Sequence, residues 1–155
     1  MNGLAPGQSA AAAVAAMLAP RTSSVINVTL TVTVPDRDII DLADTAAEGG
    51  INYWADALDI NVRARTVEIW VTDPDLDDEI PVKRTLSFDW IAKRLVQLGT
   101  GQEIEGHAGG YAGLRVQAAR YIASLMNGED DADLDAEVAD VVMQLAYFNG
   151  KVIFG

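Results

Sequence analysis

The chain has 155 residues, half of them hydrophobic, and a formal net charge of −12 at pH 7. It has no cysteine and a single histidine, His107, which excludes disulfides, cysteine-ligated metals, His-based metal clusters and most catalytic triads. The negative charge argues against direct binding to nucleic acid or an anionic membrane, and favours docking onto a basic surface. The longest apolar run is too short to span a bilayer, and no basic residue precedes it as in a secretory signal. We therefore expect a globular cytoplasmic protein that has no cofactor.

Residues 1–24 form an alanine-rich extension, and the high helix propensity of alanine predicts a helix over 9–18. Residues 25–155 are expected to form a single domain. The range 25–34 is predicted to be a strand, because apolar and polar residues alternate along it. After this strand, Asp36 is the predicted N-cap of an amphipathic helix over 36–48, which a double glycine ends.

Two further strands are predicted over 61–72 and 80–86, joined as a hairpin by an acidic tip at 73–79. Ser87 is the predicted N-cap of the next helix. Helical periodicity predicts three helices, over 88–98, 114–126 and 138–148. A short closing strand is predicted over 152–154. The residues between the first two of these helices are rich in glycine and predict a loop. The element order indicates an α+β fold, with a small, mostly antiparallel sheet of about four strands packed by helices.

The most informative stretch is the turn that follows the helix over 36–48. Gly49 and Gly50 can reach backbone conformations that other residues avoid, so the chain can turn sharply there. Tyr53 and Trp54 follow at once, and their rings can serve as a corner of the core or as a binding pocket. Glu48 is a candidate general base, because burial beside Trp54 would raise its pKa.

Two arginines are candidate ligands for an anion near these rings. Arg63 and Arg65 lie on the same side of the strand predicted over 61–72. Together with Tyr53 and Trp54 they could stack a base and hold a phosphate, because the guanidinium fork matches phosphate geometry. The alternative is that they pair with the many carboxylates of the chain.

A row of acids precedes and enters the last predicted helix, at Asp130, Asp131, Asp133, Asp135 and Glu137. Such a row usually forms a solvated link and a helix N-terminus, where the helix dipole favours negative charge. The alternative is a partner-binding face, in which spaced carboxylates imitate a phosphate backbone. Both interpretations stay open at this point.

Two segments of the chain resemble a family of small proteins encoded by bacteriophages and prophages. The segment TAAEGGINYW at 45–54 resembles the family's "TAxEGGxxYW", and 135–155 is similar to its ending, "DAxxADxxxQxALFGxVxxG". This chain departs from the ending by an inserted Asn149. The resemblance implies a phage origin and expression in the cytoplasm of a bacterial host, but no established chemistry. Within these segments, we hypothesise that Gln144 or Asp140 anchors the glycine turn.

These observations favour a non-enzymatic phage accessory protein that acts by binding and neutralises a host defence. Its partner would be a nucleotide-like small molecule held by the aromatic pocket, at the interface of a homo-oligomer, or a host protein whose basic groove the acidic face occupies. Neither version involves direct contact with nucleic acid or a membrane. Two alternatives are a structural or assembly protein of the virion, oligomerised by residues 1–24, and a nucleotide hydrolase that uses carboxylates with a divalent metal.

Overall fold

The computed structural model describes residues 24, 27, 29–72, 80–102, 104, 105, 111–129 and 133–154. The chain divides into two units, Met1–Leu30 and Thr31–Gly155, whereas the sequence predicts a boundary after residue 24. The helix predicted over 9–18 lies outside the described residues. The elements below belong to the second unit, Thr31–Gly155.

Helices and a sheet make up the second unit, which confirms the predicted α+β class. The three strands form one antiparallel sheet of order β1-β2-β3. In chain order the described elements are α2 (Asp36–Gly49), the 3₁₀ helix η1 (Ile51–Tyr53), β1 (Ala57–Asn61), β2 (Thr66–Val71), β3 (Val82–Ser87), α3 (Phe88–Gly99), α4 (Ala112–Asn127) and α5 (Ala136–Tyr147).

Helices α2 and α3 follow the apolar periodicity of the sequence closely, whereas α4 leaves the apolar residues Val116 and Met126 exposed. In α2, the four apolar residues at helical spacing, Ile39, Leu42, Ala43 and Ala46, are all buried. The hydroxyl of Ser87 accepts a hydrogen bond from the backbone N–H of Trp90 at 3.2 Å, so Ser87 caps α3 as predicted. A local signal thus places each of these helices.

The sheet has three strands where the sequence predicts about four. The described residues of the first predicted strand, Asn27 and 29–34, lie in no strand. Alternation of apolar and polar residues says which face of a strand would be buried, but a strand also needs a partner to complete its backbone hydrogen bonds. In the described sheet, β1, β2 and β3 pair only with one another.

The strand predicted over 61–72 corresponds to a turn followed by β2, and its first residue, Asn61, is the last residue of β1, a strand that the sequence analysis missed. β1 ends at Asn61 and β2 begins at Thr66, and the two pair in antiparallel register. The Asn61 side chain accepts a hydrogen bond from the backbone N–H of Ala64 at 3.0 Å, and Arg65 adopts a left-handed φ of 54°. Asparagine side chains stabilise such turns, but no glycine or proline marks this one in the sequence.

The closing strand predicted over 152–154 is also wrong. Only Lys151 forms a backbone bridge there, with Glu105. The backbone of the next residues instead bonds to a side chain: the Gln144 amide oxygen accepts from the N–H groups of Ile153 and Phe154, at 3.1 and 2.9 Å. The Gln144 amide group also donates to the Phe154 carbonyl at 2.8 Å, so it replaces the partner strand.

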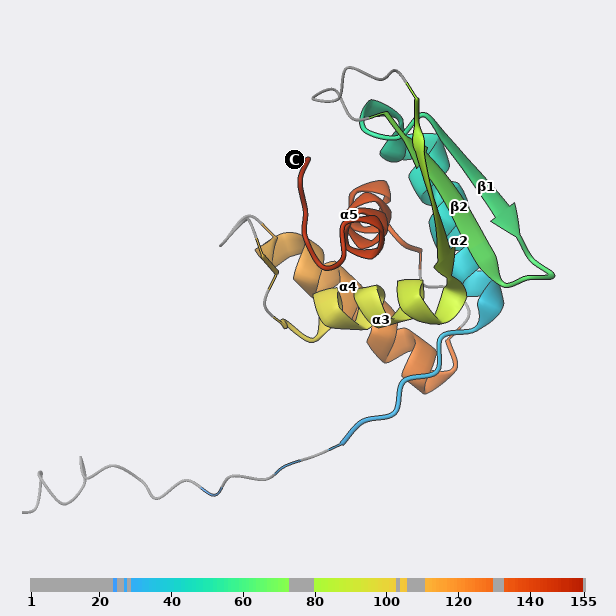
Figure 1. Ribbon diagram of the computed structural model, residues 1–155. Coiled ribbons are helices and arrows are strands. Elements are labelled where there is room, and N and C mark those ends of the chain that lie inside the picture. The colour runs from blue at the N-terminus through green and yellow to red at the C-terminus, as the bar shows by residue number, and fades with distance from the viewer. Residues whose placement is uncertain are drawn as a thin grey trace, which may run out of the picture. The chain divides into compact units, whose positions relative to one another are not determined.

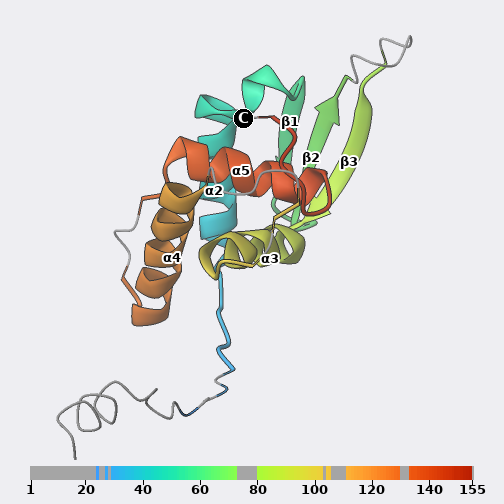
Figure 2. The same cartoon turned by 90° about the vertical axis from the view of Figure 1, so that its left-hand side faces the viewer.

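Helix α5 is the central element of this unit. It packs against α2, α3, α4 and β3, and Figure 2 shows it running between α4 on one side and the sheet on the other, with α3 beneath it. Every residue of Val138–Tyr147 is buried. Figure 1 shows the same helix, in red, almost end-on beside α2 and the sheet. A helix this completely enclosed must satisfy its polar side chains from within the protein.

The C-terminal end of α5 is held by side chains from β3 and α3. The Arg84 guanidinium donates to the carbonyl of Tyr147 at 2.5 Å, and the Trp90 indole donates to the carbonyl of Ala146 at 2.9 Å. These carbonyls belong to the last turn of the helix, where no backbone N–H is left to pair with them. A cation at this end also complements the helix dipole.

The glycine turn that ends α2 lies directly against α5. A Cβ atom added to Gly50 would lie 2.7 Å from the Cβ of Asp140, and one added to Gly49 would lie 2.6 Å from the Cβ of Ala136. Carbon atoms cannot approach this closely. The double glycine is therefore required by the close packing of two backbones, and not by the turn itself, because neither glycine has a positive φ.

We expect Gly50→Ala to lower the free energy of unfolding by about 1–3 kcal/mol, because the added methyl group must push α5 away from the turn. Gly113→Ala is the matched control, because a Cβ at Gly113 meets nothing within 4 Å and the residue lies in α4. The control should be neutral or more stable by about 0.5–1 kcal/mol. Urea denaturation measures both, and equal effects would contradict the packing argument.

Candidate functional site

The aromatic residues after the glycine turn bind the carboxylate of Asp140 on α5. The Tyr53 hydroxyl donates to Oδ2 at 2.7 Å, the Trp54 indole donates to Oδ1 at 2.6 Å, and the Gln144 amide donates to Oδ2 at 3.0 Å. Asp140 is only 7% exposed. All three donors are neutral, and none of the ion pairs in the described part of the chain includes Asp140.

The hypothesis that Asp140 or Gln144 anchors the glycine turn is confirmed in its main point. Both side chains are buried beside the turn, since Gln144 is 0% exposed and also donates to the Tyr53 hydroxyl at 3.0 Å. The bonds reach the side chains of Tyr53 and Trp54, not the backbone of the two glycines. The polar network therefore fixes the rings, and the close packing fixes the turn.

The rings at this corner belong to the core on one side and to a cavity on the other. Trp54 is buried, and its ring stacks on that of Phe154 at a centroid distance of 6.3 Å and an interplanar angle of 10°. Tyr53 is 58% exposed although its hydroxyl is bound. A mostly apolar cavity of about 360 Å³ lies here, and we call it the corner cavity; its lining includes Tyr53, Tyr111, Leu114, Glu137, Asp140 and Phe154.

The arginines expected beside these rings lie elsewhere, which corrects the nucleotide pocket predicted from the sequence. Arg65 forms a two-point ion pair with Asp36, with both distances 2.9 Å, and a third contact to Asp89 at 3.0 Å. Asp36 is the first residue of α2, whereas Tyr53 follows the end of that helix, about 20 Å away for 14 residues. Arg63 is exposed in the turn between β1 and β2. Pairing with carboxylates is the interpretation that holds for Arg65.

The hypothesis of a general base at Glu48 is also wrong. Glu48 is exposed near the end of α2, whereas Trp54 is buried. The burial beside Trp54 on which the hypothesis depends is therefore missing.

The acids expected to form a partner-binding face divide into different roles. Asp135 caps α5, because its carboxylate accepts from the backbone N–H of Glu137 at 2.8 Å. Asp133 and Glu137 are exposed. Asp130 and Asp131 lie outside the described residues, as do His107 and the acidic tip at 73–79.

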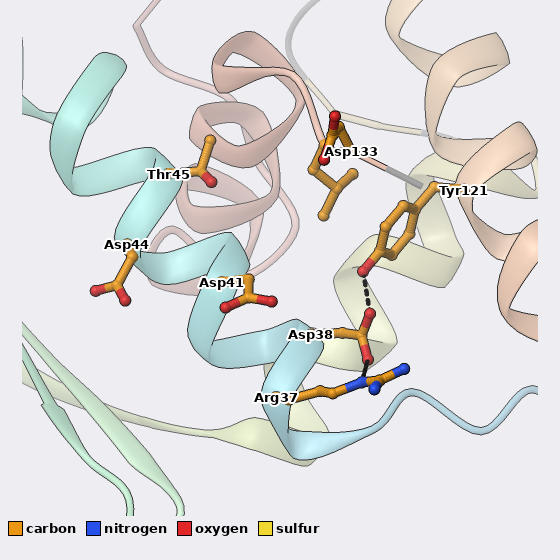
Figure 3. Close-up of a pocket in the computed structure, with 8 residues that line it drawn as sticks. Arg37, Asp38, Asp41, Asp44, Thr45, Tyr121 and Asp133 are labelled. Atoms are coloured by element: carbon orange, nitrogen blue, oxygen red, sulfur yellow. Dashed lines mark hydrogen bonds and ion pairs between the residues drawn. The ribbon is translucent and has the colours of Figure 1, made fainter. Parts of the chain in front are cut away.

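The structure reveals an acidic groove that the sequence analysis missed. Asp38, Asp41 and Asp44 of α2 line a cavity of about 470 Å³ together with Asp133 and Tyr121, and we call it the acidic groove (Figure 3). Three-residue spacing places the α2 acids on one side of the helix. This spacing is visible in the sequence, but only the fold brings Asp133 to the same groove.

Asp38 is the buried member of the acidic groove. The Tyr121 hydroxyl donates to its Oδ1 at 2.5 Å, and the Arg37 guanidinium lies 3.5 Å from its Oδ2 (Figure 3). Asp41 and Asp44 are exposed. A second cavity of about 420 Å³, which shares Tyr121 and Asp133 with the groove, extends it along α4 past Arg120. The exposed carboxylates of the groove thus lie beside a second cavity.

No protein-family model, curated protein or solved structure matches this chain. Within the described residues, no group of three or more histidine, cysteine or acidic side chains is arranged to hold a metal ion. In that same part of the chain, no helix is both long enough and apolar enough to cross a membrane.

We expect Gln144→Leu to lower the free energy of unfolding by about 1–3 kcal/mol, because the backbone of Ile153 and Phe154 loses its partner. Gln117→Leu on the exposed face of α4 is the control, with an expected change within about 0.5 kcal/mol. Hydrogen exchange locates the effect: the amides of Ile153 and Phe154 should exchange faster in Gln144→Leu only. Unchanged protection would contradict the proposed role.

Alkaline pH should destabilise the protein through its tyrosines. Burial raises the pKa of all four above the ordinary value of 10.0, and the carboxylates of Asp140 and Asp38 raise the pKa of Tyr53 and Tyr121 further. The folded protein therefore keeps protons that the unfolded chain loses. The contribution to stability is complete below about pH 10 and is lost as the pH rises above it.

Absorbance at 295 nm during a pH titration tests this expectation. Tyrosinate should appear together with unfolding, monitored by circular dichroism, and not before it. Tyr53→Phe and Tyr121→Phe each remove one raised pKa, so the decline in the free energy of unfolding above pH 10 should be shallower in both. Free titration of all tyrosines near pH 10 with the fold intact would contradict the prediction.

Proposed function

We propose that this protein is a phage-encoded accessory protein that acts by binding, without catalysis, in the cytoplasm of its bacterial host. In this proposal, the acidic groove occupies a basic surface on a host defence protein, a surface that otherwise holds nucleic acid. The observation that carries the proposal is the convergence of Asp38, Asp41, Asp44 and Asp133 on one groove, in a chain of net charge −12. The resemblance of 45–54 and 135–155 to phage proteins supplies the biological setting.

The spacing of the groove acids supports imitation of a phosphate backbone. Successive acids on α2 are three residues apart, which is about 4.5 Å along the helix axis. One DNA strand carries a charge about every 3.4 Å along its axis. The two spacings are close enough for long arginine and lysine side chains of a nucleic-acid groove to reach both. Asp41 and Asp44 are exposed and can accept such contacts.

The charge of the corner cavity argues against the other version of the proposal, nucleotide sequestration. Its charged lining residues among those described are Glu137 and Asp140, which repel a phosphate. Arg65, which would attract one, is held by Asp36 and Asp89 at the other end of α2. We therefore favour a protein partner over a nucleotide.

The test compares two triple variants of equal net charge. The groove variant is Asp41→Asn/Asp44→Asn/Asp133→Asn, and the control variant neutralises three exposed acids outside the groove, Glu48→Gln/Asp59→Asn/Glu129→Gln. Immobilised protein is used to capture host proteins from phage-infected cells, and the affinity of each purified partner is then measured at increasing salt. We expect the groove variant to bind at least tenfold more weakly than the control variant.

The same variants are then produced in host cells that carry an active defence against phage. Wild type and the control variant should restore plaque formation, and the groove variant should not. Two results would contradict the proposal: equal loss of binding in both variants, which indicates a nonspecific charge effect, and affinity that is insensitive to salt.

A further inference from the structure

We propose that the corner cavity beside Asp140 binds a small organic cation whose charged group is an alkylated ammonium. The inference goes beyond the proposed function, because it concerns a different cavity from the acidic groove and a small molecule instead of a protein surface. Its basis is a buried carboxylate without a cationic partner, placed at the wall of a cavity lined by aromatic rings.

The charge of Asp140 is the first step. A buried carboxylate in a protein is normally paired with a cation or bound to a metal, because neutral hydrogen bonds offset only part of the cost of removing it from water. Asp140 is 7% exposed and has three neutral donors, from Tyr53, Trp54 and Gln144. The described residues supply no cation to it, yet the carboxylate forms part of the cavity wall. The negative potential is therefore directed into the cavity.

The rings of the cavity are the second step. Tyr53, Tyr111 and Phe154 all contribute to the lining, and the faces of such rings attract cations. Tyr53 and Phe154 stand edge to face, 6.2 Å apart at 84°, so they form two walls of a corner. Glu137 adds a second carboxylate, and no described lining residue is basic. The cavity thus combines aromatic walls with a net negative charge.

The shortage of free acceptors decides which cation fits. A guanidinium or a primary ammonium needs several hydrogen-bond acceptors around it, but at the buried wall Oδ2 of Asp140 already receives two donors and Oδ1 receives one, and the other carboxylate, Glu137, is exposed. Most of the remaining wall, which includes Leu114 and Val141, is apolar. A methylated ammonium needs few or no acceptors and buries apolar methyl groups. At about 360 Å³, the cavity is near the lower limit for ligand sites, which suits a small molecule.

Choline and its uncharged carbon isostere, 3,3-dimethylbutan-1-ol, are the probes for this site. They have nearly the same shape and differ in charge, so their affinities separate cation binding from simple filling of an apolar cavity. The full chain is titrated with each probe by calorimetry, and the intrinsic fluorescence of its three tryptophans, of which Trp54 is bound to Asp140, gives a second readout. We expect choline to bind roughly tenfold more tightly than the isostere. Equal affinities, or no choline binding, would overturn the proposal.

Variants that leave Asp140 and its three donors in place then locate the site. Tyr111→Leu removes a ring, Tyr111→Phe keeps it, and Glu137→Gln removes an exposed charge. We expect Tyr111→Leu and Glu137→Gln each to weaken choline binding roughly three- to tenfold, and Tyr111→Phe to bind like wild type. Circular dichroism confirms that each variant folds. Wild-type affinity in both Tyr111→Leu and Glu137→Gln would overturn the assignment to this cavity.

Two controls separate this proposal from the others. The groove variant Asp41→Asn/Asp44→Asn/Asp133→Asn should bind choline like wild type, because its substitutions lie outside the corner cavity. A loss of choline binding there would indicate a general charge effect and overturn the assignment. A peptide that carries trimethyl-lysine tests the remaining source of the same chemistry. Affinity for the peptide tenfold above that for choline would overturn the small-molecule ligand and indicate a methylated lysine side chain of a partner protein instead.

Discussion

The second unit of this protein depends on the contact between the glycine turn of α2 and the backbone of α5. The absence of side chains at Gly49 and Gly50 lets the two backbones meet, since a Cβ at either position would lie within 2.7 Å of α5. This approach brings Asp140 within reach of Tyr53 and Trp54. A wider separation would leave a buried carboxylate without its donors, at a cost of several kcal/mol. Packing and polar satisfaction therefore enforce each other.

The same logic explains why α5 can be buried along its whole length. Its first turn is capped by Asp135, its middle is satisfied by the Asp140 and Gln144 network, and its last carbonyls are bound by Arg84 and Trp90. Each partner comes from a different part of the chain. The central helix thus fixes the positions of the elements around it. As a result, the corner cavity lies beside the turn at the end of α2, and Asp41 and Asp44 lie on the exposed face of α2.

The sequence predicts this fold where the information is local. The periods of the helices, the Ser87 cap and the glycine turn are all readable, because neighbouring residues decide them. Strands depend on partners far along the chain, so the alternation of apolar and polar residues at 25–34 predicted a strand that the sheet does not contain among the described residues. The turn at 62–65 was hidden because Asn61 and Arg65 form it without glycine. The role of Gln144 as a substitute strand could not be read, since nothing local marks an amide that bonds to the chain end.

The candidate sites show the same division between local and distant information. The sequence correctly placed Gln144 and Asp140 beside the glycine turn, because a buried polar residue on an apolar helix must find partners, but it did not predict that these partners are the side chains of Tyr53 and Trp54. It wrongly added Arg65, whose sequence position says nothing about which end of α2 the hairpin meets.

Folding accounts for most of the singled-out residues of the segments 45–54 and 135–155. Gly49 and Gly50 permit the helix contact, the rings of Tyr53 and Trp54 bind Asp140, and Gln144 holds the chain end. These residues therefore say more about the fold than about an activity. What distinguishes the binding properties of this chain must lie in residues that the fold does not require. Asp41 and Asp44 on the exposed side of α2 are such residues, as is Glu137 at the mouth of the corner cavity, because each presents an exposed charge at a cavity.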